Sequence, residues 1–201
     1  ITTLRQESDY YDSRHPNTVT FCNDIYLDLK RRDFTMNAIA YDLNKKKLID
    51  PYNGQEDIKN KLIKCTNNTK KILSEDSLRI YRAARFTSQL DFSIDTSIDK
   101  AAVELSKGLT PPSAERIHTE LIKTFEGKNY KTGLLLMIRW GLLDQFFNDK
   151  QKILLEKQIH TLFDKYNIYE KISHFLLPIT KKDLPQILEN LRFTKKEKAS
   201  V

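Results

Sequence analysis

The 201-residue sequence contains little cysteine, glycine or proline: 2 Cys, 5 Gly and 6 Pro. Cys22 and Cys65 stand far apart and lack the spacing of metal ligands, which argues against a zinc module or a disulfide-stabilised domain. We therefore expect a reducing, cytoplasmic compartment. The sequence also has no internal repeat and no long linker rich in Gly, Ser or Pro, so its parts are expected to pack in sequence order.

Long apolar runs are absent as well. The most apolar stretch, residues 134–143, is about half of the roughly 20 residues that span a bilayer, and Arg139 interrupts it. We expect a buried helix there and no membrane partner. With 39% hydrophobic and 30% charged residues, the chain is long enough to bury a core.

Positive charge is concentrated in the last third of the chain. The net charge of +7 comes from 34 basic and 27 acidic residues. Residues 1–64 carry 11 basic and 10 acidic side chains, residues 65–126 nine of each, and residues 127–201 14 against eight. A basic region can hold a polyanion such as RNA because phosphate contacts release counterions. The alternative is a solvated, lysine-rich surface, of which residues 195–198 are typical.

The residue pattern predicts an α+β fold, with a small, incomplete sheet followed by mostly helical structure. Strand-prone and turn-prone text alternates in the first third: strands are expected at 1–4, 18–22, 35–43 and 47–49, and turns at 12–17 and 50–54. From Glu56 onward the apolar spacing is helical and no further strand is expected. Ser74 and the Pro111–Ser113 text are expected to open helices, and Gly127 and Gly141 to separate later ones.

One group of residues with chemical potential runs from Asp28 to Ala38. Lys30, Arg31 and Arg32 are bracketed by Asp28 and Asp33, at the expected entrance to a strand. Carboxylates in these places could hold guanidinium groups rigidly enough to grip phosphates or a ribose. A surface salt-bridge cluster is the alternative.

A second group is expected on one helix. Asp76 and Arg79 would be neighbours on one face, and Arg82 and Arg85 continue at three-residue steps. A carboxylate accepts from an exocyclic amine and a guanidinium donates to a ring nitrogen, a pattern that fits cytosine and adenine. Guanine and uracil present a carbonyl and a ring N–H there and would be rejected. An ordinary surface helix with ion pairs is the alternative.

Together the two groups and their surroundings resemble the bacterial tRNA CCA-adding enzymes, class II nucleotidyltransferases related to the bacterial poly(A) polymerases. The resemblance covers about residues 1–147. It rests on short sequence segments that follow one another in the same order as in that family: Thr2–Arg5, Asp12–Pro16, Arg31–Asp42, Asp50–Gly54, Glu75–Arg79, Arg82–Phe86 and Glu115–Ile117.

The resemblance implies an activity and a set of roles. The activity is template-independent addition of C and A, from CTP and ATP, to the 3′ end of tRNA. The nucleotide-binding residues that it implies are Arg32, Asp76, Arg79, Arg82 and Arg85, with Asp76 and Arg79 as the template that selects the base. Asp28 would support Arg32 or the ribose, the Asp12–Arg14 text is similar to part of a flexible loop, and Glu115–Arg116 is similar to a motif that stabilises the neck.

The family also holds Mg²⁺ with an Asp-x-Asp pair that precedes the text matched here, so no catalytic residue and no metal ligand is expected in this chain. The implied domains are the C-terminal part of a nucleotidyltransferase head at 1–62, a helical neck with the template helix at 63–126, and a helical body that starts the tRNA-binding region at 127–201. The head part is expected to leave an open sheet edge or an exposed apolar face.

Two alternatives to this function stay open. A bacterial poly(A) polymerase is one, although the Asn37–Asp42 text is more similar to the CCA-adding branch. The other is a non-catalytic remnant that binds RNA or nucleotides. The remaining residues with chemical potential favour structural roles: His15, His118, His160 and His174 lack metal-ligand spacing, and Trp140, Phe146 and Phe147 lie at helical spacing with leucines.

Overall fold

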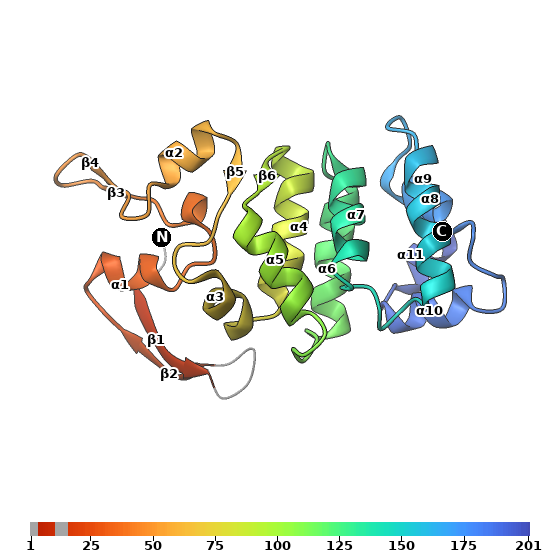
Figure 1. Cartoon of the computed structure of the whole chain (residues 1–201), viewed down its shortest axis with the longest axis horizontal. Coiled ribbons are helices and arrows are strands. Elements are labelled where there is room, and N and C mark those ends of the chain that lie inside the picture. The colour runs from red at the N-terminus through yellow and green to blue at the C-terminus, as the bar shows by residue number, and fades with distance from the viewer. Residues whose placement is uncertain (1–3, 11–15) are drawn as a thin grey trace. The chain divides into compact units, whose positions relative to one another are not determined.

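The computed structural model describes residues 4–10 and 16–201. The chain divides into two compact units, one formed by Ile1–Ile80 with Phe92–Pro111 and the other by Tyr81–Asp91 with Pro112–Val201. Figure 1 shows that helices dominate and that the described strands pair in twos. The expected α+β class is confirmed.

The first unit holds the strands. β1 (Arg5–Tyr10) pairs antiparallel with β2 (Pro16–Phe21), β3 (Ala40–Asp42) antiparallel with β4 (Lys47–Ile49), and β5 (Leu62–Ile63) parallel with β6 (Ser93–Ile94). The strands expected at 18–22 and 47–49 are confirmed. The expectation of no strand after Glu56 is wrong, because β5 and β6 are two residues long and too short for alternation to reveal.

The strand expected at 35–43 is confirmed only over β3. Its first part is a short 3-10 helix, η1 (Thr35–Asn37), in which the Ala38 N–H donates to the Thr35 carbonyl at 3.0 Å. The Thr35 N–H itself donates to the Lys64 carbonyl at 2.9 Å, so tertiary contact has replaced strand pairing here. Most of the strand expected at 1–4, and most of the turn expected at 12–17, lie outside the described residues; Pro16 and Asn17 belong to β2.

Short helices complete the first unit: α1 (Ile25–Lys30), α2 (Gly54–Lys59), α3 (Thr69–Glu75), α5 (Thr96–Leu105) and the first turn of α4 (Leu78–Leu90). The sequence did not reveal α1, since six residues give no periodic signal. Its start is defined by Asp24, whose carboxylate accepts the Tyr26 N–H at 2.8 Å. The core residues of this unit include Leu29, Phe34, Ala38, Ile63, Leu73, Ile98 and Ala102.

The turn expected at 50–54 is confirmed, and backbone geometry explains its sequence. Asp50 accepts the N–H groups of Gly54 and Gln55 at 2.7 and 2.9 Å, which caps α2. Asn53 adopts a left-handed conformation with φ of 58°, which asparagine tolerates better than most residues. A Cβ on Gly54 would lie 2.2 Å from the Thr35 carbonyl oxygen, so the two segments meet closely only because Gly54 has no side chain.

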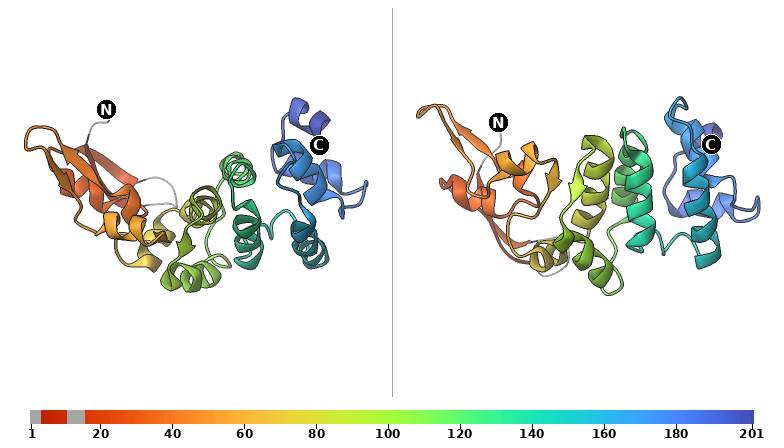
Figure 2. Two further views of the ribbon diagram at one scale, coloured as in Figure 1. Left: turned by 90° about the horizontal axis from the view of Figure 1, so that it is seen from above. Right: turned by 45° about the horizontal axis from the view of Figure 1, so that its top comes forward.

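The second unit is helical over its described length. It takes the rest of α4 and adds α6 (Ala114–Phe125), α7 (Tyr130–Arg139), α8 (Asp149–Thr161), α9 (Ile168–Leu176), α10 (Leu184–Asn190) and α11 (Lys195–Ser200). Helices α6 and α7 pack side by side (Figures 1 and 2). The expected boundaries are confirmed: Ser113 precedes α6, Gly127 follows it, and Gly141 follows α7 with φ of 71°.

The apolar stretch 134–143 lies in the core of the second unit, as expected. Leu134, Met137 and Leu143 are fully buried. Trp140, Phe146 and Phe147 are buried as well, which confirms them as core residues. Among the described residues, no helix combines the length and the apolar composition that crossing a bilayer requires.

Candidate functional site

The basic run of the first unit is organised around a buried carboxylate. Asp28, in α1, is only 2% exposed, and its Oδ1 meets Nη2 of Arg31 at 2.6 Å while its Oδ2 meets Nη2 of Arg32 at 3.0 Å. Arg32 also donates from Nη1 to the Asn37 carbonyl at 3.2 Å. A solvated surface cluster would not bury its acid, so the alternative of a surface salt bridge does not describe this arrangement. The Arg32 side chain stays 37% exposed and is held from one side.

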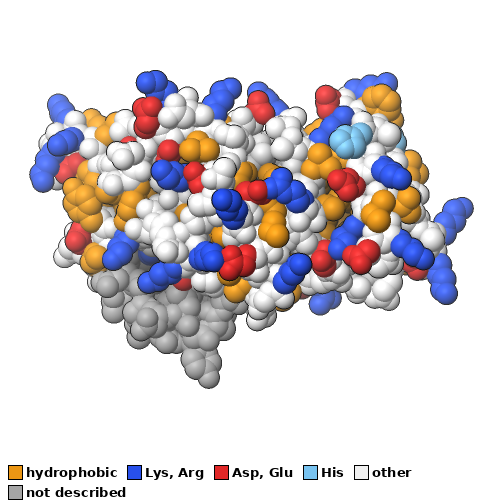
Figure 3. Space-filling model, viewed as in Figure 1, with side chains coloured by type: hydrophobic (Ala, Val, Ile, Leu, Met, Phe, Trp, Pro, Cys, Tyr) orange, Lys and Arg blue, Asp and Glu red, His pale blue; other side chains and the backbone are white. Residues whose placement is uncertain are grey.

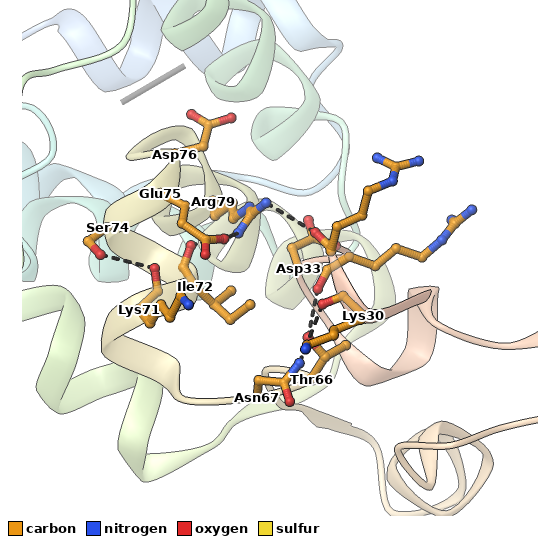
Figure 4. Close-up of polar contacts among 12 residues, drawn as sticks. Lys30, Asp33, Thr66, Asn67, Lys71, Ile72, Ser74, Glu75, Asp76 and Arg79 are labelled. Carbon is orange, nitrogen blue, oxygen red and sulfur yellow. Dashed lines mark hydrogen bonds and ion pairs between the residues drawn. The ribbon is translucent and has the colours of Figure 1, made fainter. Parts of the chain in front are cut away.

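The second acid of the run orders the backbone that follows Arg32. Asp33 is 7% exposed and accepts from the Phe34 N–H at 2.9 Å and from the Asn37 side-chain amide at 3.0 Å. The Thr66 hydroxyl donates to the Arg32 carbonyl at 2.7 Å, joining this segment to the chain before α3 (Figure 4). The orientation of Arg32 is therefore determined by its backbone as well as by Asp28.

Asp76 lies between two helices and not within one. α3 ends at Glu75, Asp76 has extended dihedrals of −145° and 108°, and its Oδ1 accepts the Leu78 N–H at 3.0 Å at the start of α4. The expectation that Ser74 opens the helix, with Asp76 and Arg79 on one helical face, is wrong. Ser74 belongs to the last turn of α3, where its hydroxyl donates to the Lys71 carbonyl. Asp76 is the better cap because its carboxylate is directed at the free amides of α4.

Arg79 is held by three protein oxygens. Its Nη1 donates to the Ile72 carbonyl and to the Glu75 carboxylate, each at 2.8 Å, and its Nη2 donates to the Arg31 carbonyl at 3.1 Å. Figure 4 shows Glu75 and Arg79 directed toward each other, with the Asp76 carboxylate standing apart from both. The Arg79 residue is 8% exposed, whereas Asp76 is half-buried. The structure thus joins Arg79 to the first group of residues through the Arg31 carbonyl.

The later turns of α4 belong to the second unit and present Arg82 and Arg85 to the ring of Phe86. The guanidinium carbons lie 5.2 and 4.0 Å from the ring centroid. Arg85 also meets Glu120 of α6, with Nε 2.6 Å from Oε2, and both residues are buried. The sequence reasoning missed Glu120. A signal was present, because Glu120 shares the helical face of Ile117 and Leu121 and an acid in such a stripe requires a partner.

The other residues with chemical potential make contacts typical of structural roles or lie outside the described residues. His118 Nε2 is 3.3 Å from the Glu197 carboxylate, and its ring packs on that of Phe193 at 4.8 Å. Burial raises the pKa of the Cys65 thiol to about 12, which leaves it neutral and unsuited to nucleophilic attack. The Asp12–Arg14 text and His15 lie outside the described residues. Within the described ranges, no group of three or more His, Cys, Asp or Glu side chains is arranged to hold a metal ion.

The lysines of the basic C-terminal third differ in their surroundings. Lys152 bonds Asp144 at 2.7 Å and Asp149 at 2.9 Å, whereas Lys150 and Lys157 are exposed. On the face shown in Figure 3, Lys and Arg side chains are interspersed with Asp and Glu. Lysines of this region that are exposed, and not Lys152, are therefore the candidates for phosphate contacts.

Comparison with known proteins identifies the family. Residues 1–64 match the family model of the poly A polymerase head domain, and residues 91–153 match that of the probable RNA- and SrmB-binding site of polymerase A, together more than half of the chain. The CCA-adding enzyme of Staphylococcus epidermidis is 37% identical over all 201 residues. The chain belongs to the CCA-adding enzyme family.

Other members of the CCA-adding enzyme family are similar in sequence and structure. The enzyme of a Geobacillus species is 46% identical over 142 residues, which are 71% of this chain and 35% of that protein. The crystal structure of the Bacillus stearothermophilus CCA-adding enzyme in complex with CTP has a TM-score of 0.74 and 29% identity, and the match covers 97% of this chain and 47% of that one. The chain spans from about a third to about half of the length of these relatives, including 48% of the Staphylococcus enzyme.

Proposed function

We propose that the protein carrying this chain adds C and A, from CTP and ATP, to the 3′ end of tRNA without a nucleic-acid template. The observation that carries the proposal is the arrangement around Arg79, a buried guanidinium held by Glu75 and by the Ile72 and Arg31 carbonyls, with the half-buried Asp76 three residues before it in the chain. The relative of known structure was solved with CTP, which supports a nucleotide as the ligand.

In this proposal Asp76 and Arg79 read the edge of the base. The carboxylate accepts from the exocyclic amine of cytosine or adenine, and the guanidinium donates to the ring nitrogen beside it. Three protein acceptors keep Arg79 in one orientation before the nucleotide arrives, so little reorganisation accompanies binding. Uracil and guanine would leave both contacts unpaired or repulsive, and the site would reject them.

Arg32, backed by Asp28, is proposed to bind the phosphates or the ribose of the incoming nucleotide, because Asp28 and the Asn37 carbonyl hold its guanidinium while the side chain stays 37% exposed. Arg82 and Arg85 are proposed as further nucleotide contacts on the family resemblance. Within the described part of the chain the residues do not fit Mg²⁺, so the proposal assigns that ion to carboxylates elsewhere in the protein and derives no step from it. The boundaries at 1–62, 63–126 and 127–201 stay proposals, as does the cytoplasm as compartment.

Two other functions were open from the sequence. Poly(A) addition is not favoured, since the relatives described above are CCA-adding enzymes. A non-catalytic module that binds RNA or nucleotides differs from the proposal in a simple observable. If the protein were such a module, the complete gene product mixed with tRNA and CTP or ATP would bind the tRNA but would not extend it.

The decisive experiment measures incorporation of each of the four nucleotides into tRNA by the complete gene product. Asp76→Ala and Arg79→Ala should each weaken discrimination against UTP and GTP, by factors on the order of 10⁴ at most. Glu56→Ala is the matched control, because its carboxylate faces Lys59 at 3.9 Å on an exposed helix. Unchanged nucleotide preference in folded variants would refute the template assignment.

The tRNA partner is tested separately through the basic third of the chain. Lys150→Glu and Lys157→Glu should weaken tRNA binding and reduce the slope of affinity against salt, since each removes a candidate phosphate contact. Lys45→Glu, an exposed lysine outside that region, is the control. Binding that is equally insensitive to all three changes would mean that the basic excess is only a solvated surface.

A further inference from the structure

Three aromatic rings gather at the loop between α8 and α9. Phe163 and Tyr166 lie in that loop, and their ring centroids are 5.4 Å apart at an interplanar angle of 76°. His174, from the last turn of α9, lies 5.5 Å from Tyr166 and 6.2 Å from Phe163. We refer to these three residues as the aromatic cluster. They lie beyond the family motifs and outside the nucleotide site, within residues 127–201, which are expected to start the tRNA-binding region.

Phe163 packs against two rings of the cluster and still leaves much of its own surface exposed. Phe163 is 52% exposed, whereas its neighbour Leu162 is 2% exposed and anchors the loop. The Tyr166 N–H donates to the Phe163 carbonyl at 3.2 Å, which closes a turn. The ring is therefore held in a defined place with much of its surface in water, and the turn and the neighbouring rings restrict its motion.

Positive charge accompanies the cluster. Lys165 places its ammonium group 5.7 Å from the Phe163 ring centroid, and Lys171 lies 4.1 Å from that of Tyr130. The nearby acids face protein groups: Glu170 accepts the Asn167 N–H at 2.8 Å, and Asp164 contributes, after burial, to raising the pKa of Tyr130. Within residues 163–174 the two lysines stand against Asp164 and Glu170, and the excess of positive charge belongs to residues 127–201 as a whole, with 14 basic and eight acidic side chains. An exposed ring beside lysines in a basic region is the combination that binds nucleobases and phosphates together.

We propose that the aromatic cluster is an RNA contact, in which an unpaired base of the tRNA stacks on Phe163 while Lys165 meets its phosphate. The proposal rests on tRNA as the partner of the protein. It adds a contact that reads no sequence, because every base has a face that can stack. A second protein that covers the ring would be the competing occupant, and charge favours RNA.

The test compares three variants of the complete gene product in tRNA binding. Phe163→Ala should weaken binding about tenfold with little change in its dependence on salt, since stacking is lost and no phosphate contact is. Phe163→Trp should restore the affinity, and its indole emission should be quenched when RNA is added, above the background of the buried Trp140. Leu177→Ala is the control, as it removes a 68% exposed side chain without a ring.

The same variants are measured with a single-stranded RNA oligonucleotide and for nucleotide addition, which separates this proposal from the proposed function. Normal addition and unchanged binding by Phe163→Ala would overturn the stacking contact alone. Absence of addition by the wild-type protein would overturn the proposed function, and the oligonucleotide would still decide whether Phe163 stacks. Equal weakening of tRNA binding by Phe163→Ala and Leu177→Ala would show that the loss is not specific to the ring. A sedimentation coefficient that Phe163→Ala lowers relative to wild type, in the absence of RNA, would identify a protein-binding surface. Either result would overturn the proposal.

Discussion

Arg79 donates a hydrogen bond to the backbone carbonyl of Arg31 at 3.1 Å, although the two residues are 48 positions apart. The side chain of Arg31 is itself held by Asp28 at 2.6 Å. The proposed base-reading guanidinium and the proposed phosphate-binding run are thereby parts of one hydrogen-bonded arrangement within the first unit. A substitution at one end should therefore alter the position of the side chains at the other.

Glu75→Gln should lower nucleotide selectivity without abolishing it. The substitution keeps the shape of the side chain but removes the charge that faces Arg79 at 2.8 Å, while the Ile72 and Arg31 carbonyls remain. A charge-assisted bond of this kind contributes on the order of 1.5–3 kcal/mol. The measurement is the ratio of CTP to UTP incorporation beside the melting temperature. A loss of stability with an unchanged ratio would mean that Glu75 supports the fold alone.

Asp28→Asn should destabilise the protein by about 3 kcal/mol, because it leaves Arg31 and Arg32 facing a buried neutral group. Denaturant unfolding gives the free energy, and the apparent affinity for CTP should fall with it if Arg32 binds phosphate. Glu104→Gln is the comparison, since its exposed pair with Lys70 should be worth less than about 1 kcal/mol. Similar costs for the two variants would contradict the structural importance of the buried acid.

Glu120→Gln should also cost about 3 kcal/mol, because the buried Arg85 loses its acid at 2.6 Å. Arg85→Met and Glu120→Leu each leave one buried charge without its partner, so the double variant should cost less stability than the sum of these two single changes. Glu115→Gln, which breaks an exposed pair with Arg192, should cost less than about 1 kcal/mol. Additive effects in the cycle would show that the two groups do not interact.

Gly54→Ala should destabilise by roughly 1–3 kcal/mol or more, since its Cβ would meet the Thr35 carbonyl oxygen at 2.2 Å and the backbone would have to move. Gly108→Ala provides the control, because a Cβ there has no heavy atom within 4 Å. Thermal melting of the two variants beside wild type checks the prediction. Equal melting temperatures would mean that the contact between the Gly54 and Thr35 segments relaxes without cost.

Asp50 should give stability a dependence on pH in the acid range. Burial acts to raise its pKa, but the N–H groups of Gln55 and Gly54 outweigh that effect and the pKa is lowered. The folded state thus binds the proton more weakly than the unfolded state, whose pKa is about 3.9. The stabilisation is present above that value and is lost as the pH falls through the folded pKa. The difference in unfolding free energy between wild type and Asp50→Asn should be constant near pH 6–7 and shrink below about pH 4.

Local chemistry accounts for what the sequence predicted well. The β4 strand, the start of α6 at Ser113 and the turn of residues 50–54 depend on neighbours within a few positions, so their residues report them directly. The core roles of Trp140 and Phe147 follow in the same way from helical spacing with leucines. The family could be recognised from the sequence because its motifs keep their order along the chain.

Tertiary structure alone decided how the candidate site is held. Asp76 was expected within a helix, but its carboxylate caps α4, a choice between two nearby capping groups that propensity does not resolve. The hydrogen bond from Arg79 to the Arg31 carbonyl and the ion pair between Arg85 and Glu120 join residues far apart in sequence. Such pairings are settled by burial, because a guanidinium taken out of water needs acceptors that only the packed chain supplies. The sequence by itself indicated the candidate residues of the site, and the fold determined their partners and the directions in which they point.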